Sequence, residues 1–126
     1  MSYGVIASKS ANMMVETIAG AGGNDSDGAL DRFQSIWGGA WVPGRVTLTR
    51  LHLNFIPNRA GRGLAMLDLN LRDIHVVELS GGRVSKVMGL RTGTHLVNIR
   101  ALGIGNLAPE IAQLAEAARK TPQRRR

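Results

Sequence analysis

The chain has 126 residues, of which 44% are hydrophobic, and a formal net charge of +7. This length provides for one domain with one hydrophobic core, and the absence of cysteine excludes disulfide bonds, thiolate nucleophiles and sulfur-ligated metal sites. No secretory signal pattern occurs and no apolar run approaches the roughly 20 residues that span a bilayer, so we expect a cytoplasmic protein, at most attached peripherally to a membrane.

Turn-forming residues separate two predicted strands in the N-terminal third. The apolar stretch at residues 11–18 predicts a first strand, although a short helical turn fits the same pattern. Residues 20–28 are rich in Gly, Asn and Asp and predict a mobile connection. They lack the alternate spacing and the distal Glu of an EF-hand calcium loop. Residues 33–41 return to a strand-like composition, with a bulge or bend at Gly38.

The most regular pattern lies between Pro43 and Pro57. Apolar and polar residues alternate in two sets that are offset around Thr49 and Arg50, which predicts two antiparallel strands joined by a tight turn. A basic loop follows at residues 58–63, and turns are predicted near residues 80–83 and 91–94. Short strands at such regular spacing are typical of a sandwich or barrel.

The last predicted element is a helix, because the hydrophobic period changes. Apolar residues recur three and four positions apart and form one face: Leu107, Ile111, Leu114, Ala115 and Ala118. Asn106 is the expected N-cap, and Pro109 is tolerated in a first turn. An amphipathic helix after a series of strands favours a plug over one open end of a curved sheet.

The predicted hairpin also carries a family signature. Residues 44–55 contain a Gly-Arg pair, then Val-Thr-Leu-Thr, and then a returning Leu-Asn-Phe. This order resembles the GRAM domain, in its bacterial type, which belongs to the pleckstrin-homology (PH) superfamily. In that family a Gly-basic pair opens a strand, a Leu-x-Leu-Thr run follows and Leu-x-Phe returns. A basic residue usually precedes the Leu-x-Phe, where this chain has His52.

Two later blocks resemble the same family in the same order. Residues 69–78 are similar to the family's strand in which a polar residue is followed by Asp and Ile, and then by apolar residues and an acidic residue. Residues 87–99 are similar to its late hairpin, with Ile99 where Phe is common. With the following helix, the resemblance covers residues 43–118. It implies a mainly β fold, a PH-like curved sheet or barrel capped by a C-terminal amphipathic helix.

We expect one PH/GRAM-like domain over residues 1–118, with the membership of residues 1–30 left open, and then a basic flexible tail. The tail carries five positive charges and no acid, which leaves +2 of the net +7 for the rest of the chain. These charges are Arg119, Lys120, Arg124, Arg125 and Arg126. They also complement the dipole of the preceding helix. Because aromatic and groove-reading elements are missing, we do not expect a nucleic-acid partner.

No arrangement in the sequence is typical of a catalytic or metal site. The histidines at positions 52, 75 and 95 lie in or beside predicted strands and lack the i, i+4 pairing of a zinc helix. His52 and His75 are expected at the surface. A Ser-His-Asp constellation forms only in space, so the sequence leaves it open. Gly103 and Gly105 are too few for a dinucleotide fingerprint. We expect no catalysis, no cofactor and no metal.

Two binding functions compete, and protein interaction is favoured. Trp37 and Trp41 would share one face of a strand, where burial of at least one of them in the core is the favoured interpretation. An exposed one could anchor a protein partner or a second copy of the chain. An exposed sheet edge could also accept a partner strand.

The alternative is weak attachment to anionic membrane lipids through basic loops and the tail. The residues that are candidates for binding anionic lipid headgroups are Arg59, Arg62, Arg83 and Lys86. Each basic residue near an anionic surface contributes about 1 kcal/mol, so a few give weak, salt-sensitive attachment. Solvated loops often carry arginine without binding any lipid, and this interpretation is favoured for each of these residues taken alone. The chain also lacks the dense basic run of the PH domains that bind phosphoinositides tightly.

Overall fold

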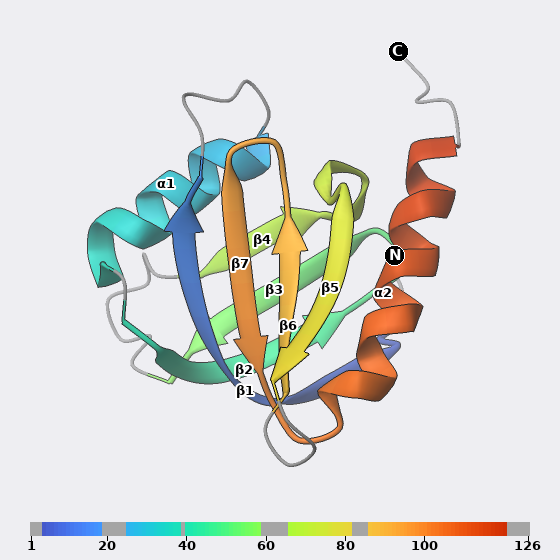
Figure 1. Ribbon diagram of the computed structural model, residues 1–126, viewed down its shortest axis with the longest axis horizontal. Helices are drawn as coiled ribbons and strands as arrows, with labels where there is room; N and C mark the ends of the chain where they lie inside the picture. The colour runs from blue at the N-terminus through green and yellow to red at the C-terminus, as the bar shows by residue number, and fades with distance from the viewer. Residues whose placement is uncertain (1–3, 19–24, 39, 59–65, 82–85, 121–126) are drawn as a thin grey trace.

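The computed structural model describes residues 4–18, 25–38, 40–58, 66–81 and 86–120. Seven strands form one antiparallel sheet in the order β4-β3-β2-β1-β7-β6-β5, together with two α-helices and one 3-10 turn, η2 (Figure 1). The elements in chain order are β1 (Ala7–Thr17), α1 (Asp25–Trp37), β2 (Val42–Leu48), β3 (His52–Pro57), β4 (Leu67–Asn70), η2 (Leu71–Asp73), β5 (Val76–Gly81), β6 (Lys86–Arg91), β7 (His95–Arg100) and α2 (Ile104–Lys120).

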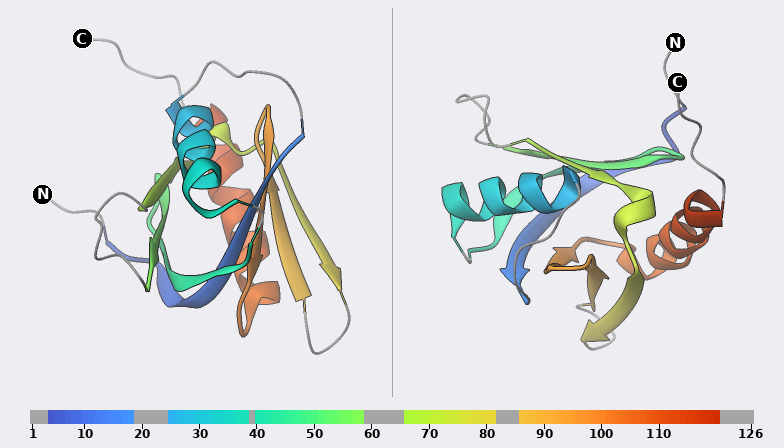
Figure 2. Two further views of the ribbon diagram at one scale, coloured as in Figure 1. Left: turned by 90° about the vertical axis from the view of Figure 1, so that its left-hand side faces the viewer. Right: turned by 90° about the horizontal axis from the view of Figure 1, so that it is seen from above.

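The long strand β1 joins the two halves of the sheet. Its first part pairs with β2, from Ala7 opposite Leu48 to Met13 opposite Val42. Its second part pairs with β7, up to Thr17 opposite His95. The sheet curves along this strand, so that one of its faces encloses the core (Figure 2).

The sheet remains open, with β4 and β5 as its two edges. Helix α2 and η2 pack together beside these edges, and α2 also contacts β5 and β6 (Figures 1 and 2). One face of α2 is buried in the core: Ile104, Leu107, Ala108, Ile111 and Ala115. The amphipathic C-terminal helix that the sequence predicts therefore covers the open side of a curved sheet, and the predicted fold class is confirmed.

The predicted central hairpin is confirmed as β2 and β3. Val46 pairs with Phe55 and Leu48 with Leu53, and all four side chains are buried. The turn is closed by a backbone hydrogen bond of 2.9 Å in which the Thr49 amide donates to the carbonyl of residue 52. Alternation is clear here because both strands present one face to the core and the other outward.

The predicted strand at residues 33–41 is wrong, because residues 33–37 belong to helix α1. The connection predicted at residues 20–28 is also wrong from Asp25 onward, because the helix begins there. Leu30, Phe33 and Trp37 lie three and four positions apart, which is a helical period, and the first two are buried. Helix α1 packs on β4 and β1, and Phe33 meets Phe55 edge-on at 6.0 Å. Gly38, with φ of +66°, follows the last helical residue and ends the helix.

Helix α2 also differs from its prediction at both ends. It begins at Ile104, so Asn106 lies inside the helix and is not its N-cap. Pro109 consequently lies in the second turn. The helix continues to Lys120, two residues into the expected tail, and Arg119 donates a hydrogen bond to the carbonyl of Ile74. The predicted turn at residues 91–94 is confirmed between β6 and β7.

Candidate functional site

The residues expected to bind partners are distributed unevenly over the structure. Arg59, Arg62 and Arg83 lie outside the described residues. Lys86 is the first residue of β6 and is exposed. Trp37 and Trp41 are brought together at one pocket, although they do not share a face of a strand as predicted. The pocket formed by the tryptophans is therefore the best-defined of the predicted sites.

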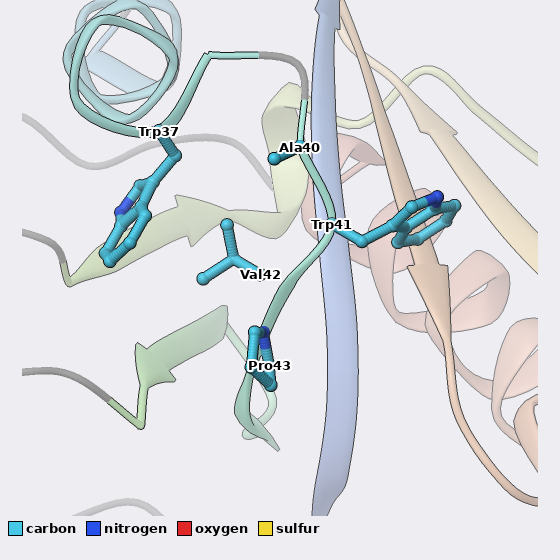
Figure 3. A pocket seen from close by; sticks show the side chains of 5 residues that line it. All are labelled: Trp37, Ala40, Trp41, Val42 and Pro43. Carbon is cyan, nitrogen blue, oxygen red and sulfur yellow. The ribbon is translucent and has the colours of Figure 1, made fainter.

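This pocket, which we call the tryptophan pocket, is lined by Trp37, Ala40, Trp41, Val42 and Pro43 and has a volume of about 290 Å³ (Figure 3). The chain leaves α1 at its first tryptophan, turns at Gly38 and enters β2 at Val42. The two rings point in different directions from this short connection (Figure 3). All five lining side chains are apolar apart from the indole N–H groups, so the pocket suits an apolar group of a ligand.

Packing fixes both rings. Trp37 is partly buried and stacks at a tilt on Phe33 of the core, with 6.3 Å between ring centroids. Trp41 is also partly buried, and the guanidinium of Arg100 lies 4.4 Å from its ring centroid, a cation–π contact. A ligand entering this pocket would meet aromatic surfaces that are already ordered, which lowers the entropic cost of binding.

The indole nitrogen of Trp37 lacks a hydrogen bond. Nε1 is buried, and no described residue accepts its proton. A buried donor without an acceptor costs about 1 to 3 kcal/mol. Phenylalanine at position 37 would avoid this cost but would leave part of the volume of the indole unfilled.

A buried histidine forms a cluster that the sequence did not predict. His95, at the start of β7, is 1% exposed; its Nε2 lies 2.8 Å from Oδ1 of Asp31 on α1, and its Nδ1 lies 2.7 Å from Oγ1 of Thr94. Asp31 and His95 are 64 positions apart in the chain. A second polar contact between helix and sheet joins Thr17 and Gln34.

The residue types of this cluster are those of a nucleophile, base and acid triad, but its geometry favours a structural role. Thr94 is only 6% exposed and lies in the tight turn before β7, so a substrate cannot approach its hydroxyl without displacing the turn. The hydroxyl also contacts Nδ1, while the carboxylate contacts Nε2, the reverse of the usual arrangement. The cluster attaches α1 to the sheet. The other two histidines differ from it, since His75 is exposed and His52 is partly exposed.

A second surface lies beside the sheet edge formed by β5. The side chains of β5 are exposed except for Val77, which is partly buried. A hollow of about 180 Å³ is lined by residues of this strand and of α2. Its lining is mixed: Ile74, His75, Val77, Ala112, Ala115, Glu116 and Arg119. This lining contains Glu116 and Arg119, and Arg119 already donates a hydrogen bond to the carbonyl of Ile74. The surface is therefore less apolar than the tryptophan pocket.

The described residues meet neither the requirements of a metal site nor those of a membrane-spanning helix. No three of their His, Cys, Asp or Glu side chains are grouped in a way that could hold a metal ion. Neither of the two α-helices in the described part of the chain is long and apolar enough to cross a membrane.

Comparison with known proteins identifies the fold. No protein-family model matches the sequence, and no curated protein is significantly similar to it. Among solved structures, the Vps36 N-terminal PH domain is similar with a TM-score of 0.59 over 91% of this chain and 80% of that domain, at 16% identity. The C-terminal domain of an unknown protein from Leishmania infantum is similar with a TM-score of 0.51 over 89% of this chain and 84% of that one, at 13% identity. The chain therefore has a PH-like fold, as its sequence pattern predicts.

Proposed function

We propose that this chain is a non-catalytic binding module of the GRAM type that recognises a protein partner, a different protein or a second copy of itself. The tryptophan pocket receives an apolar side chain of that partner. The observation that carries the proposal is the presence of two partly exposed, ordered tryptophans around one apolar hollow of about 290 Å³. Tryptophan is the residue most enriched among the energetic hot spots of protein interfaces.

The surroundings of the pocket support an interface. Ile36, next to Trp37 on α1, is 43% exposed and adds apolar surface on the same short segment. The Nε1 of Trp37 is buried and has no acceptor among the described residues. A pocket lined by aromatic side chains, with exposed apolar surface beside it, is typical of the anchor region of a protein interface.

The experiment selects binders from a random peptide library displayed on phage, using the full chain as bait. Selected peptides are then tested against three variants: Trp41→Ala, which removes one wall of the pocket; Trp37→Phe, which keeps an aromatic ring and removes the indole N–H; and Leu79→Ala, the matched control on β5. Binding is followed by tryptophan fluorescence, because both tryptophans of the chain line the pocket. Denaturation curves establish that each variant is folded.

The proposal predicts peptides whose affinity falls about thirtyfold with Trp41→Ala and is unchanged with Leu79→Ala, because the loss of a hot-spot contact of about 2 kcal/mol lowers the affinity by about that factor. Trp37→Phe should weaken binding while the variant remains folded. Sedimentation at increasing protein concentration tests the second-copy case, in which Trp41→Ala dissociates the assembly. Peptides that bind Trp41→Ala as well as the wild type would contradict the proposal, as would a monomer that selects no peptide.

A further inference from the structure

The loop between β7 and α2 carries the most exposed of the large apolar side chains in the described residues. Leu102 is 90% exposed, whereas the next, Val5, is 61% exposed. The loop lies at one end of the sheet, at the bottom of Figure 1. A single exposed leucine is ordinary on a protein surface. The charges that surround this one are what distinguish it.

Two lysines from separate strands flank the loop. Lys9 of β1 donates a hydrogen bond of 2.9 Å from Nζ to the carbonyl of Leu102. The same Nζ lies 3.2 Å from the position that a Cβ would occupy at Gly103. Lys86 of β6 places its Nζ 4.0 Å from the corresponding position at Gly105. Both ammonium groups therefore lie against the backbone immediately after the exposed leucine.

The hollow beside the loop has no acidic side chain among the described residues that line it. A hollow of about 200 Å³ is lined by Lys86, Ala101, Leu102, Gly103, Ile104, Gly105 and Asn106, none of which is acidic. The first turn of α2 also contains no acid. An anion can enter this hollow without meeting a carboxylate among its lining residues.

The backbone holds the leucine outward. Gly103 has φ of +72°, a conformation that suits glycine, and the Lys9 ammonium holds the preceding carbonyl. The side chain therefore extends from a short turn between two regular elements. An apolar tip with positive charges beside it matches the interface of an anionic bilayer, where acyl chains lie beneath a layer of phosphates.

We propose that this loop docks on an anionic phospholipid bilayer, with Leu102 inserted among the acyl chains and Lys9 and Lys86 at the lipid phosphates. The function is additional to protein recognition and uses different residues from the tryptophan pocket. Only Lys86 belongs to the basic residues that the sequence suggests for this role. The leucine and Lys9 are identified by the structure, because the lysine and the loop are 93 positions apart.

The test is co-sedimentation of the full chain with vesicles at about 0.15 M salt. One set contains phosphatidylcholine alone and the other contains about 30% phosphatidylserine. The variants are Leu102→Ser, Lys86→Ala and Lys9→Ala, each checked for folding by thermal denaturation. The matched controls are Leu51→Ser, an exposed leucine in the β2–β3 turn; Arg50→Ala, an exposed cation in the same turn; and Trp41→Ala in the tryptophan pocket.

The wild type should bind the anionic vesicles and not the neutral ones. Leu102→Ser should lower the partition coefficient about tenfold or more, and each lysine variant should lower it about fivefold. The three controls should bind as the wild type does. The proposal is overturned if the wild type binds neither vesicle, or if Leu102→Ser and Lys86→Ala bind as well as the wild type, which would assign the attraction to other cations of the chain.

Discussion

Replacing Gly44 by alanine will destabilise the fold, because the hairpin leaves no room for a Cβ atom at this position. The added Cβ would lie 2.5 Å from the carbonyl oxygen of Ile56, 2.6 Å from Cζ of Phe55 and 2.8 Å from Cα of Pro57. Two of these atoms belong to the backbone of β3, where Pro57 is the cross-strand partner of Gly44. Side-chain rotation cannot relieve those contacts, so the strands must separate locally.

The magnitude follows from two opposing terms. Overpacking of a close-packed site costs about 1 to 3 kcal/mol, and the backbone contacts place Gly44→Ala near the upper value. Removing a glycine also restricts the unfolded chain, which returns about 0.4 to 1 kcal/mol. The net loss of unfolding free energy is about 2 kcal/mol, or a melting temperature lower by roughly 8 °C at about 4 °C per kcal/mol.

Guanidinium denaturation followed by tryptophan fluorescence measures this difference. The matched control is Gly28→Ala in α1, where nothing lies within 4 Å of the added Cβ. Helix propensity predicts that this control is more stable than the wild type by about 0.8 to 1 kcal/mol. The reasoning is refuted if Gly44→Ala is as stable as the wild type within about 0.5 kcal/mol, since a surface substitution has an effect of that size.

Three further substitutions test contacts around α1 and the tryptophan pocket by the same denaturation assay. Gly38→Ala should cost about 1 kcal/mol because its φ of +66° disfavours a side chain; an unchanged stability would contradict the described helix end. Asp31→Ala removes an acceptor 2.8 Å from the buried His95 and should cost about 1 to 2 kcal/mol; no loss would mean that the contact is not formed. Arg100→Ala should change the emission of Trp41 and cost about 0.5 to 1 kcal/mol, and unchanged emission would argue against the stacked geometry.

The sequence predicts the sheet best where one face of each strand is buried. In β2 and β3 the buried residues Val46, Leu48, Leu53 and Phe55 alternate with residues that are partly or fully exposed, so the period is visible without any tertiary information. The C-terminal helix is visible for the same reason, with its period of three to four. The order of these elements also permits the resemblance to the PH superfamily.

The sequence does not predict helix α1, because the helical pattern is short and lies between segments rich in glycine. Residues 25–28 continue the turn-rich composition of the preceding segment, and only Leu30, Phe33 and Trp37 show the helical period. The composition around Gly38 favours a bulge in a strand, whereas its positive φ ends a helix. The two tryptophans consequently belong to a helix end and a connection, not to one strand.

The remaining site residues could not be predicted because they meet only through the topology of the sheet. Asp31 contacts His95 after β7 returns beside β1, and Lys9 contacts Leu102 at the other end of the same pair of strands. Such contacts depend on strand order and register, and no local pattern specifies them. Arg100 beside Trp41 arises in the same way.

The most direct test of protein recognition at the tryptophan pocket is a ¹H–¹⁵N NMR titration of the labelled chain with a selected peptide. The chain has two tryptophans, so its spectrum contains two indole N–H signals, and both report on the pocket. We predict that both signals shift with the same dissociation constant, while the amides of β5 remain in place. Indole signals that stay unchanged while amides elsewhere shift would show that the partner binds at another surface and would contradict the proposed function.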